Sequence, residues 1–217
     1  MTSTKKLSAV VTASFLVSGL LSNIAFAAPK PSTKPAANNG QIQITCNPTT
    51  PKIQKFTKNK VITLTTNCGD IVIEALSKSA PVTTSMLTGL VSAKFYDASI
   101  CHRMIYSQTA ALLQCGDPTA SGFGGPTFQF DDENLPKQAL NNYPVGTVAM
   151  ANSGANTNGS QFFIMAANTT LDPNYSIWGR VIKGLEIVQA VVANGTTDGS
   201  EVGQPKVKIA IEKATVR

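Results

Sequence analysis

The chain has 217 residues, is 42% hydrophobic and carries a formal net charge of +6 at pH 7. The positive charge comes from one end, because residues 1–60 contain eight Lys and no Asp or Glu, while the remainder carries ten basic against twelve acidic residues. Nucleic-acid-binding domains cluster Lys and Arg on the folded surface, so a basic tail on a nearly neutral domain predicts no nucleic-acid partner. The length suggests one domain or two small ones.

Residues 1–27 have the pattern of a secretory signal peptide. Lysines at 5–6 form a positive start, residues 7–21 are apolar, and Ala-Phe-Ala at 25–27 fits the small-x-small rule for cleavage before Ala28. The apolar stretch is short for a membrane span, so an uncleaved anchor is the less favoured alternative. We therefore expect an exported protein (extracellular, periplasmic or in the cell envelope) with no stable membrane span after cleavage.

Residues 28–59 are rich in Pro, Lys, Thr, Asn and Gln, and we interpret them as a linker followed by an ordered lead-in around Cys46. The tail is best interpreted as solvated, and contact with an anionic envelope surface is the alternative. The main folded domain is expected over 60–217. It opens with β-branched runs at 61–65 and 71–76, and the Asn-Cys-Gly-Asp sequence between them predicts a β-hairpin.

Two helices are expected. Pro81 is favoured at the first position of a helix, where its missing N–H would be unpaired anyway, and a second apolar periodicity lies near 185–192. Further strands are predicted at 100–105, 112–115, 147–151, 162–166, 177–182 and 207–216, with a Gly- and Pro-rich loop at 116–126. Many short strands with two helices predict a mainly β protein, a closed or nearly closed barrel capped by the helices.

All four cysteines lie in the part expected to be exported: Cys46, Cys68, Cys101 and Cys115. An oxidising compartment favours disulfides, but four cysteines allow three pairings and the spacing does not choose among them. Buried free thiols are the alternative. The chain has no CxxC motif and a single histidine that neighbours one cysteine, so a metal site is poorly supported.

Two motifs suggest chemistry that other residues exclude. Gly154 and Gly159 have the spacing of a phosphate-binding loop, but Ser160 stands where that loop needs its lysine. A Ser/His/Asp hydrolase would have to use His102, the only histidine, and the chain has no GxSxG sequence. We interpret His102 as a hydrogen-bonded structural residue.

The remaining motifs are His-Arg at 102–103, Gln-Cys-Gly-Asp at 114–117, and Met-Ala-Asn-Ser-Gly-Ala-Asn-Thr-Asn-Gly-Ser-Gln-Phe-Phe at 150–163. Together they resemble the hallmarks of the cyclophilin family, and the last segment matches over fourteen positions with freedom at two. The resemblance covers 60–217. It implies a closed eight-stranded antiparallel barrel capped by two α-helices, and peptidyl-prolyl cis–trans isomerase activity on proline-containing polypeptides. We expect no cofactor and a monomer.

The resemblance also assigns roles to residues. Arg103 matches the catalytic arginine and Gln114 the glutamine that orients it. The substrate-binding positions are Phe163, Leu171, Leu112, Ala111, Asn152, Gln161 and Tyr175. Asn152 and Gln161 match the residues that hold the peptide backbone. Among the substrate-binding positions, Ala111 stands where the family usually has a pocket Phe, which predicts that one aromatic wall is missing. A non-catalytic proline-peptide binding module is therefore the alternative, although Arg103 together with Gln114 argues against it.

The resemblance finally suggests a disulfide pairing. Cys101 and Cys115 fall on strands that pair in this fold, which predicts a Cys101–Cys115 disulfide. Cys46–Cys68 would then join the lead-in to the first hairpin.

Overall fold

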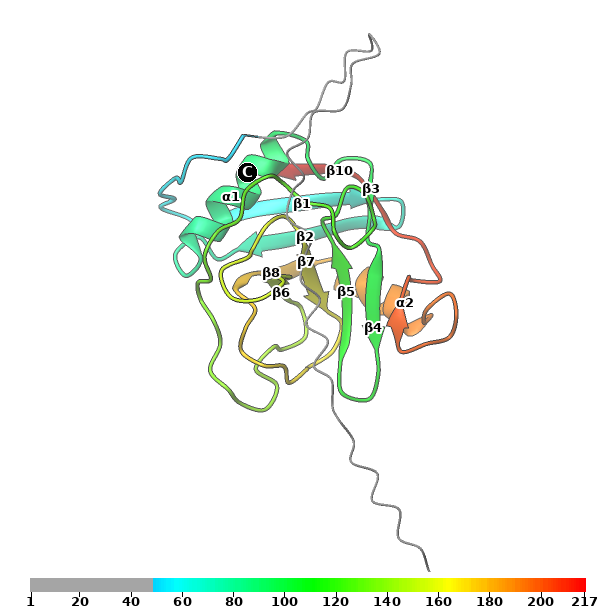
Figure 1. The fold of residues 1–217 in the computed structure, drawn as a ribbon. Helices are drawn as coiled ribbons and strands as arrows, with labels where there is room; N and C mark the ends of the chain where they lie inside the picture. The colour runs from blue at the N-terminus through cyan, green and yellow to red at the C-terminus, as the bar shows by residue number, and fades with distance from the viewer. Residues whose placement is uncertain (1–48) are drawn as a thin grey trace, which may run out of the picture. The chain divides into compact units, whose positions relative to one another are not determined.

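A computed structural model describes residues 49–217, which form one curled antiparallel sheet, a half-barrel, with two helices (Figure 1). The elements are β1 (Lys60–Thr66), β2 (Gly69–Ala75), α1 (Pro81–Ser92), β3 (Ser99–Ile100), β4 (Arg103–Tyr106), β5 (Ala111–Cys115), β6 (Thr147–Met150), β7 (Phe162–Met165), β8 (Ile177–Lys183), α2 (Leu185–Ala193), β9 (Val202–Gly203) and β10 (Ala210–Val216). The predicted signal peptide, its cleavage site and most of the linker lie outside the described residues.

The predicted hairpin is confirmed as β1 and β2, which pair from Lys60↔Ala75 to Thr66↔Gly69. Alternate residues of both strands are buried, as the period of a strand with one covered face requires. Gly69 has a φ of +116°, a conformation that side chains disfavour, so the turn needs a glycine there.

The strand order is β3-β10-β1-β2-β8-β6-β7-β5-β4-β9, which places the last long strand beside the first. The sheet has ten strands instead of the predicted eight, and two of the ten, β3 and β9, have only two residues each. The strand predicted at 100–105 is divided, because β3 pairs with β10 whereas β4 pairs with β5 and β9. Closure of the sheet into a barrel remains a prediction.

Both helices are confirmed, and α1 is capped from a distance. The residue before it, Ala80, offers no side-chain cap. Instead, the Glu133 carboxylate accepts hydrogen bonds from the backbone N–H groups of Val82 and Thr83. A negative charge stabilises a helix N-terminus, so a residue about fifty positions away supplies what the local sequence lacks.

The described part of the lead-in, residues 49–59, packs against α1. The Ser85 hydroxyl donates to the Gln54 carbonyl and accepts from the Gln54 N–H, both at 2.9 Å. Pro51 lies so close to Gly89 that any Cβ at position 89 would overlap its ring. The small residues Ser85 and Gly89 of α1 therefore allow the lead-in to pack closely against the helix.

The interior holds two hydrophobic clusters on opposite faces of the central strands. Leu113 of β5 and Ile164 of β7 belong to the larger cluster, whereas their neighbours Leu112 and Phe163 belong to the smaller one. This division follows from the alternation of side chains along a strand. The smaller cluster lies on the face that carries the candidate site.

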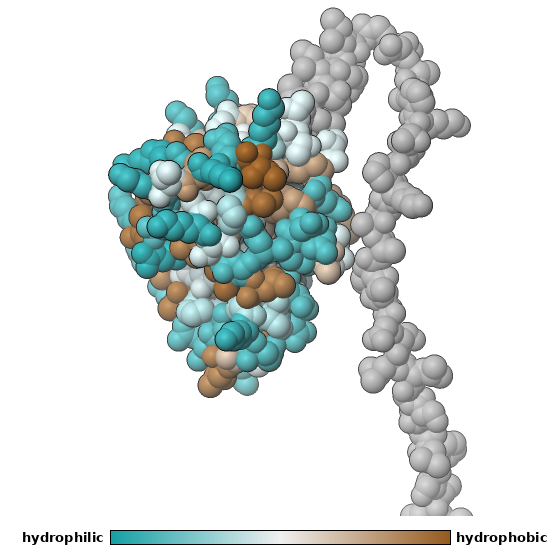
Figure 2. All heavy atoms as spheres, turned by 90° about the vertical axis from the view of Figure 1, so that its left-hand side faces the viewer, coloured by the Kyte–Doolittle hydropathy of each residue, from teal (hydrophilic) through white to brown (hydrophobic). Residues whose placement is uncertain are grey.

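The surface is mixed, and Figure 2 shows small hydrophobic groups among hydrophilic side chains on one face. Within residues 49–217, neither helix has the length and hydrophobicity that a membrane crossing requires.

Candidate active site

The register of the sheet places the principal predicted residues in one row. Arg103 on β4 is the cross-strand partner of Gln114 on β5, which in turn is the partner of Phe163 on β7. Ala149 on β6 continues the row as the partner of Phe163. Directly opposed residues of antiparallel strands point to the same face, so a guanidinium, an amide and an aromatic ring lie side by side.

This row forms part of a cleft of about 380 Å³. The cleft is lined by Arg103, Ile105, Leu112, Gln114, Gly122, Ala151, Asn152, Phe163, Leu171 and Tyr175. The structure thus brings together seven of the predicted site residues. Ile105 was not among the residues predicted from the sequence, although its spacing of two from Arg103 on the same strand could have placed it on this face.

A chain of amide hydrogen bonds orients Arg103. Its Nη1 donates to Gln114 Oε1 at 3.0 Å, and Gln114 Nε2 donates to Gln161 Oε1 at 2.8 Å. Gln161 Nε2 donates in turn to the carbonyls of Gly122 and Gly124, at 3.0 and 2.9 Å. Gln161 was predicted to hold a peptide backbone, but here its side chain connects Gln114 to the 116–126 loop and is not among the lining groups.

The 116–126 loop is organised around the buried carboxylate of Asp117. This carboxylate accepts hydrogen bonds from Thr119 N and Oγ1, Ser121 Oγ, Gly122 N and Gly124 N. Burial by itself raises the pKa of Asp117, but the hydrogen bonds from Thr119, Gly124 and Gly122 outweigh it and the pKa lies below its ordinary value. The loop that receives Gln161 is therefore held by an ionised group.

Arg103 is half-buried. Burial lowers the pKa of its guanidinium, and the neighbouring Tyr175 opposes that shift. Because an arginine side chain remains protonated in proteins, Arg103 brings a permanent positive charge and several N–H donors to the cleft.

Aromatic rings lie at the cleft and beneath it, and two of them, Phe163 and Tyr175, are lining residues. Phe163 and Tyr175 meet edge to face with their centroids 5.4 Å apart, and Tyr143 lies 6.2 Å from each of them. Tyr143 is fully buried and was not among the residues predicted from the sequence. Its contacts lie far along the chain, and nothing in its local pattern indicates them.

Asn152 lines the cleft, but its side chain also forms hydrogen bonds with the surrounding loops. Its Nδ2 donates to the Asn174 carbonyl at 2.8 Å and its Oδ1 accepts from Gly154 N at 3.2 Å. The predicted contact with a peptide backbone could use the second N–H of this amide or the remaining lone pair of its oxygen.

Ala111 does not lie where the resemblance placed it. It is buried in the larger cluster, on the face of β5 opposite Leu112, and is not among the lining residues of the cleft. Tyr106, its cross-strand partner, is half exposed and also points away from the cleft. The alternation of side chains explains this difference, because Leu112 and Gln114 already occupy the cleft face.

His102 differs from its prediction. It is buried, yet neither ring nitrogen has a hydrogen-bond partner within residues 49–217. Burial lowers the pKa of His102. The negative charge of Asp117 opposes this shift, whereas the positive charge of Arg103 adds to it. In the same part of the chain no three His, Cys, Asp or Glu side chains are grouped closely enough to hold a metal ion.

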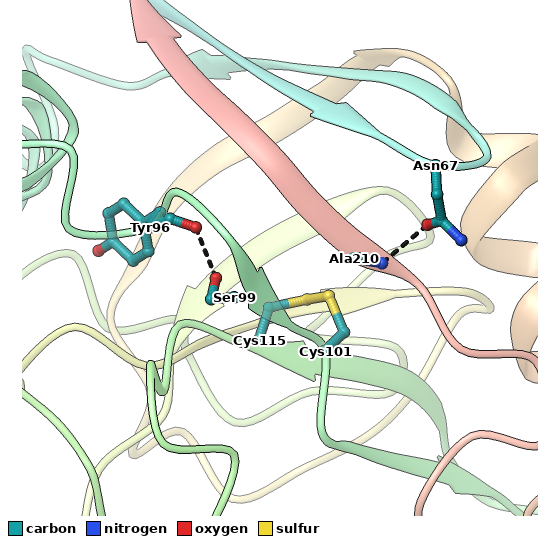
Figure 3. Close-up of a disulfide and its surroundings, with 6 residues drawn as sticks. All are labelled: Asn67, Tyr96, Ser99, Cys101, Cys115 and Ala210. Carbon is teal, nitrogen blue, oxygen red and sulfur yellow. Dashed lines mark hydrogen bonds between the residues drawn. A yellow bond between two sulfur atoms is a disulfide. The ribbon is translucent and has the colours of Figure 1, made fainter.

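The predicted disulfide between Cys101 and Cys115 is confirmed, with the two Cα atoms 4.0 Å apart (Figure 3). It lies directly beside the Arg103–Gln114 pair, and both of its cysteines are buried. Cys68 is exposed and has no disulfide partner in the described part of the chain. Cys46 lies outside that part, so the Cys46–Cys68 pair stays a prediction.

Comparisons with known proteins agree with this geometry. Residues 61–216 match the family described as cyclophilin type peptidyl-prolyl cis-trans isomerase/CLD. A Mycobacterium tuberculosis (strain H37Rv) protein named "Probable peptidyl-prolyl cis-trans isomerase B" is 34% identical over 208 residues, which cover 85% of this chain and 67% of that protein. A Mycobacterium leprae protein of the same name is 35% identical over 159 residues, and the match spans 69% of this chain but only 54% of that protein.

Solved structures give the same result. The crystal structure of a Cryptosporidium parvum cyclophilin type peptidyl-prolyl cis-trans isomerase superimposes with a TM-score of 0.63 at 27% identity, covering 73% of this chain and 98% of that one. A second structure of that protein, determined in the presence of the dipeptide Ala-Pro, gives a TM-score of 0.62. The chain therefore belongs to the family of cyclophilin-type peptidyl-prolyl cis–trans isomerases.

Proposed function

We propose that the cleft is the active site of this isomerase, and that Arg103 is the residue that accelerates rotation about Xaa-Pro bonds. The observation that carries the proposal is the hydrogen bond from Arg103 Nη1 to Gln114 Oε1, made beside the apolar floor of Phe163. A donor held in a fixed direction next to an apolar surface is the arrangement that this reaction needs.

The reaction is a bond rotation with little net driving force. The amide C–N bond resists rotation by about 18–20 kcal/mol because the nitrogen lone pair is delocalised into the carbonyl. For an Xaa-Pro bond the two isomers differ by only about 0.5–1 kcal/mol. The enzyme therefore needs only to lower a barrier, and the rotation requires no nucleophile or general base.

Arg103 can lower this barrier electrostatically. A guanidinium N–H directed at the proline nitrogen favours a lone pair localised on that nitrogen, which is the state of the twisted amide. The interaction is weaker in the planar ground state, so it stabilises the transition state selectively. Gln114 fixes the direction of the guanidinium and so reduces its freedom before the substrate arrives.

The apolar part of the cleft can bind the proline ring. Phe163 and Leu112 belong to the buried cluster beneath the cleft, and Leu171 packs against that cluster. Such a surface would hold the ring by burial while the chain before it rotates. The presence of Ala-Pro with the solved structure of the Cryptosporidium parvum relative supports this assignment.

Export to an oxidising compartment is the setting that we propose for this activity, with slow prolyl steps in the folding of exported proteins as its targets. The support is the signal-peptide pattern of residues 1–27 together with a buried disulfide at Cys101–Cys115. Sequencing the amino terminus of protein recovered from the native cells tests the export step. A mature chain starting at Ala28 is expected, and a chain that retains residues 1–27 would contradict it.

The catalytic proposal is tested by measuring the isomerisation of short Xaa-Pro peptides by wild type, Arg103→Ala and Arg180→Ala. Arg180 is a matched control because it is an exposed arginine whose Nε contacts Glu74 at 2.6 Å. It lies on β8, which is separated from β4 by β6, β7 and β5 in the sheet. We expect Arg103→Ala to lower kcat/KM by about 100-fold, as loss of a transition-state donor does, and Arg180→Ala to leave it unchanged. A wild type that binds proline peptides without accelerating isomerisation would instead establish the binding module.

A further inference from the structure

We infer that Tyr143 is a positioning residue that fixes the wall of the cleft formed by Leu171 and Tyr175. The inference rests on the proposed function, since it assumes that this wall contacts the bound peptide. Tyr143 itself is fully buried and does not line the cleft, so it acts through the residues that do.

The hydroxyl of Tyr143 is used entirely by the segment that carries the wall. It accepts a hydrogen bond from Tyr175 N at 3.1 Å and donates to the carbonyl of Tyr175 at 3.1 Å. The carbonyl of Asp172, at 3.4 Å, is a second and more distant acceptor for the same hydroxyl. Burial raises the pKa of Tyr143 to about 12, which keeps the hydroxyl protonated and able to donate at neutral pH. One buried side chain thereby fixes the backbone of residue 175.

The ring of Tyr143 connects the same segment to the floor. Its centroid lies 6.2 Å from that of Phe163 and 6.2 Å from that of Tyr175. Offset and edge-on aromatic pairs within this range attract each other. The floor and the wall therefore contact one buried ring, which sets their separation.

Asn142, the residue before Tyr143, holds the other end of the wall. Asn142 Nδ2 donates to the Leu171 carbonyl at 2.7 Å, and its Oδ1 accepts from Leu171 N at 3.0 Å. The backbone of Tyr143 also pairs with that of Thr169 in both directions at 3.1 Å. The dipeptide 142–143 thus clamps the wall at both lining residues.

A wall that contacts the peptide in both ground state and transition state contributes uniform binding, so loosening it should raise KM and spare kcat. We expect Tyr143→Phe to raise KM by about fivefold to tenfold with kcat within about twofold of wild type. Asn142→Ala, which releases Leu171 instead of Tyr175, should change the constants in the same direction.

Tyr96→Phe is the matched control. Tyr96 is also buried, its hydroxyl donates to one backbone carbonyl, that of Ser160, at 3.1 Å, and its ring packs in the larger cluster away from the wall. Both phenylalanine variants should lower the melting temperature, but only Tyr143→Phe should raise KM. Equal KM values in the two variants would overturn the inference and leave the proposed function intact, because the wild type would still be active and dependent on Arg103.

Amide hydrogen exchange gives a readout that is independent of activity. In Tyr143→Phe the Tyr175 amide loses its acceptor, so its exchange should accelerate while strands β5 and β7 keep their protection. Unchanged exchange at Tyr175 would mean that the hydroxyl does not hold the wall, and this outcome would also overturn the inference.

Discussion

Arg103 and Gln114 face each other across β4 and β5, and the only bond that joins their side chains runs from a guanidinium N–H to an amide oxygen at 3.0 Å. Gln114 uses its amide nitrogen for Gln161, so both ends of its side chain are engaged. Rotation of the amide would exchange donor and acceptor and break both hydrogen bonds. The direction in which Arg103 points is therefore set by a residue that has a single suitable orientation.

Replacing Gln114 with Leu should lower activity with little effect on folding. The leucine removes the acceptor for Arg103 and leaves the guanidinium free to move, and a misplacement of about 1 Å can cost about 100-fold in rate. We expect kcat/KM for an Xaa-Pro peptide to fall by about 10-fold to 100-fold. Circular dichroism and the melting temperature should show that the variant is folded. Activity equal to wild type would mean that Arg103 needs no such support.

The buried carboxylate of Asp117 should make stability depend on pH in the acid range. Because its folded pKa lies below that of the unfolded chain, about 3.9, the stabilisation is complete above that pH and is lost as the pH falls through the folded pKa. Asp117→Asn removes this dependence and leaves buried loop N–H groups poorly paired, at a cost of about 1–3 kcal/mol at pH 7. Urea unfolding between pH 7 and pH 2 measures both effects.

The comparison between the two proteins isolates Asp117, because the other acidic groups are shared. The stability curves of wild type and Asp117→Asn should converge as the pH falls below 4. Curves that stay parallel over this range would show that the Asp117 carboxylate does not hold the 116–126 loop.

Local pattern was enough to predict much of the fold and of the site. The alternation in β1 and β2 and the proline at the start of α1 depend on neighbours in sequence, and both elements form as expected. The capping of α1 by Glu133 and the clamp at Tyr143 join residues 29–51 positions apart, and no periodicity records such contacts. The division of the 100–105 segment has a similar cause. Its two parts, β3 and β4, pair with β10 and β9, which come from the far end of the chain.

The Cys101–Cys115 disulfide should contribute measurably to stability. It joins residues 14 apart in sequence. If the constraint on the unfolded chain dominates, a loop of this size stabilises the fold by about 3 kcal/mol. The double variant Cys101→Ala/Cys115→Ala should therefore unfold at a lower urea concentration than oxidised wild type. Wild type treated with a reducing agent should move toward the double variant, and a difference below about 0.5 kcal/mol would contradict the prediction.

Ala111→Phe distinguishes the observed register from the one that the resemblance suggested. In the structure Ala111 packs in the larger cluster, so a phenylalanine there should overfill the core and destabilise the protein by about 1–3 kcal/mol, with no gain in kcat/KM. Leu112→Phe is the control, because Leu112 lines the cleft and its enlargement should change KM for Xaa-Pro peptides. Higher activity in Ala111→Phe would place position 111 in the cleft, and the face assigned to β5 would then have to be reversed.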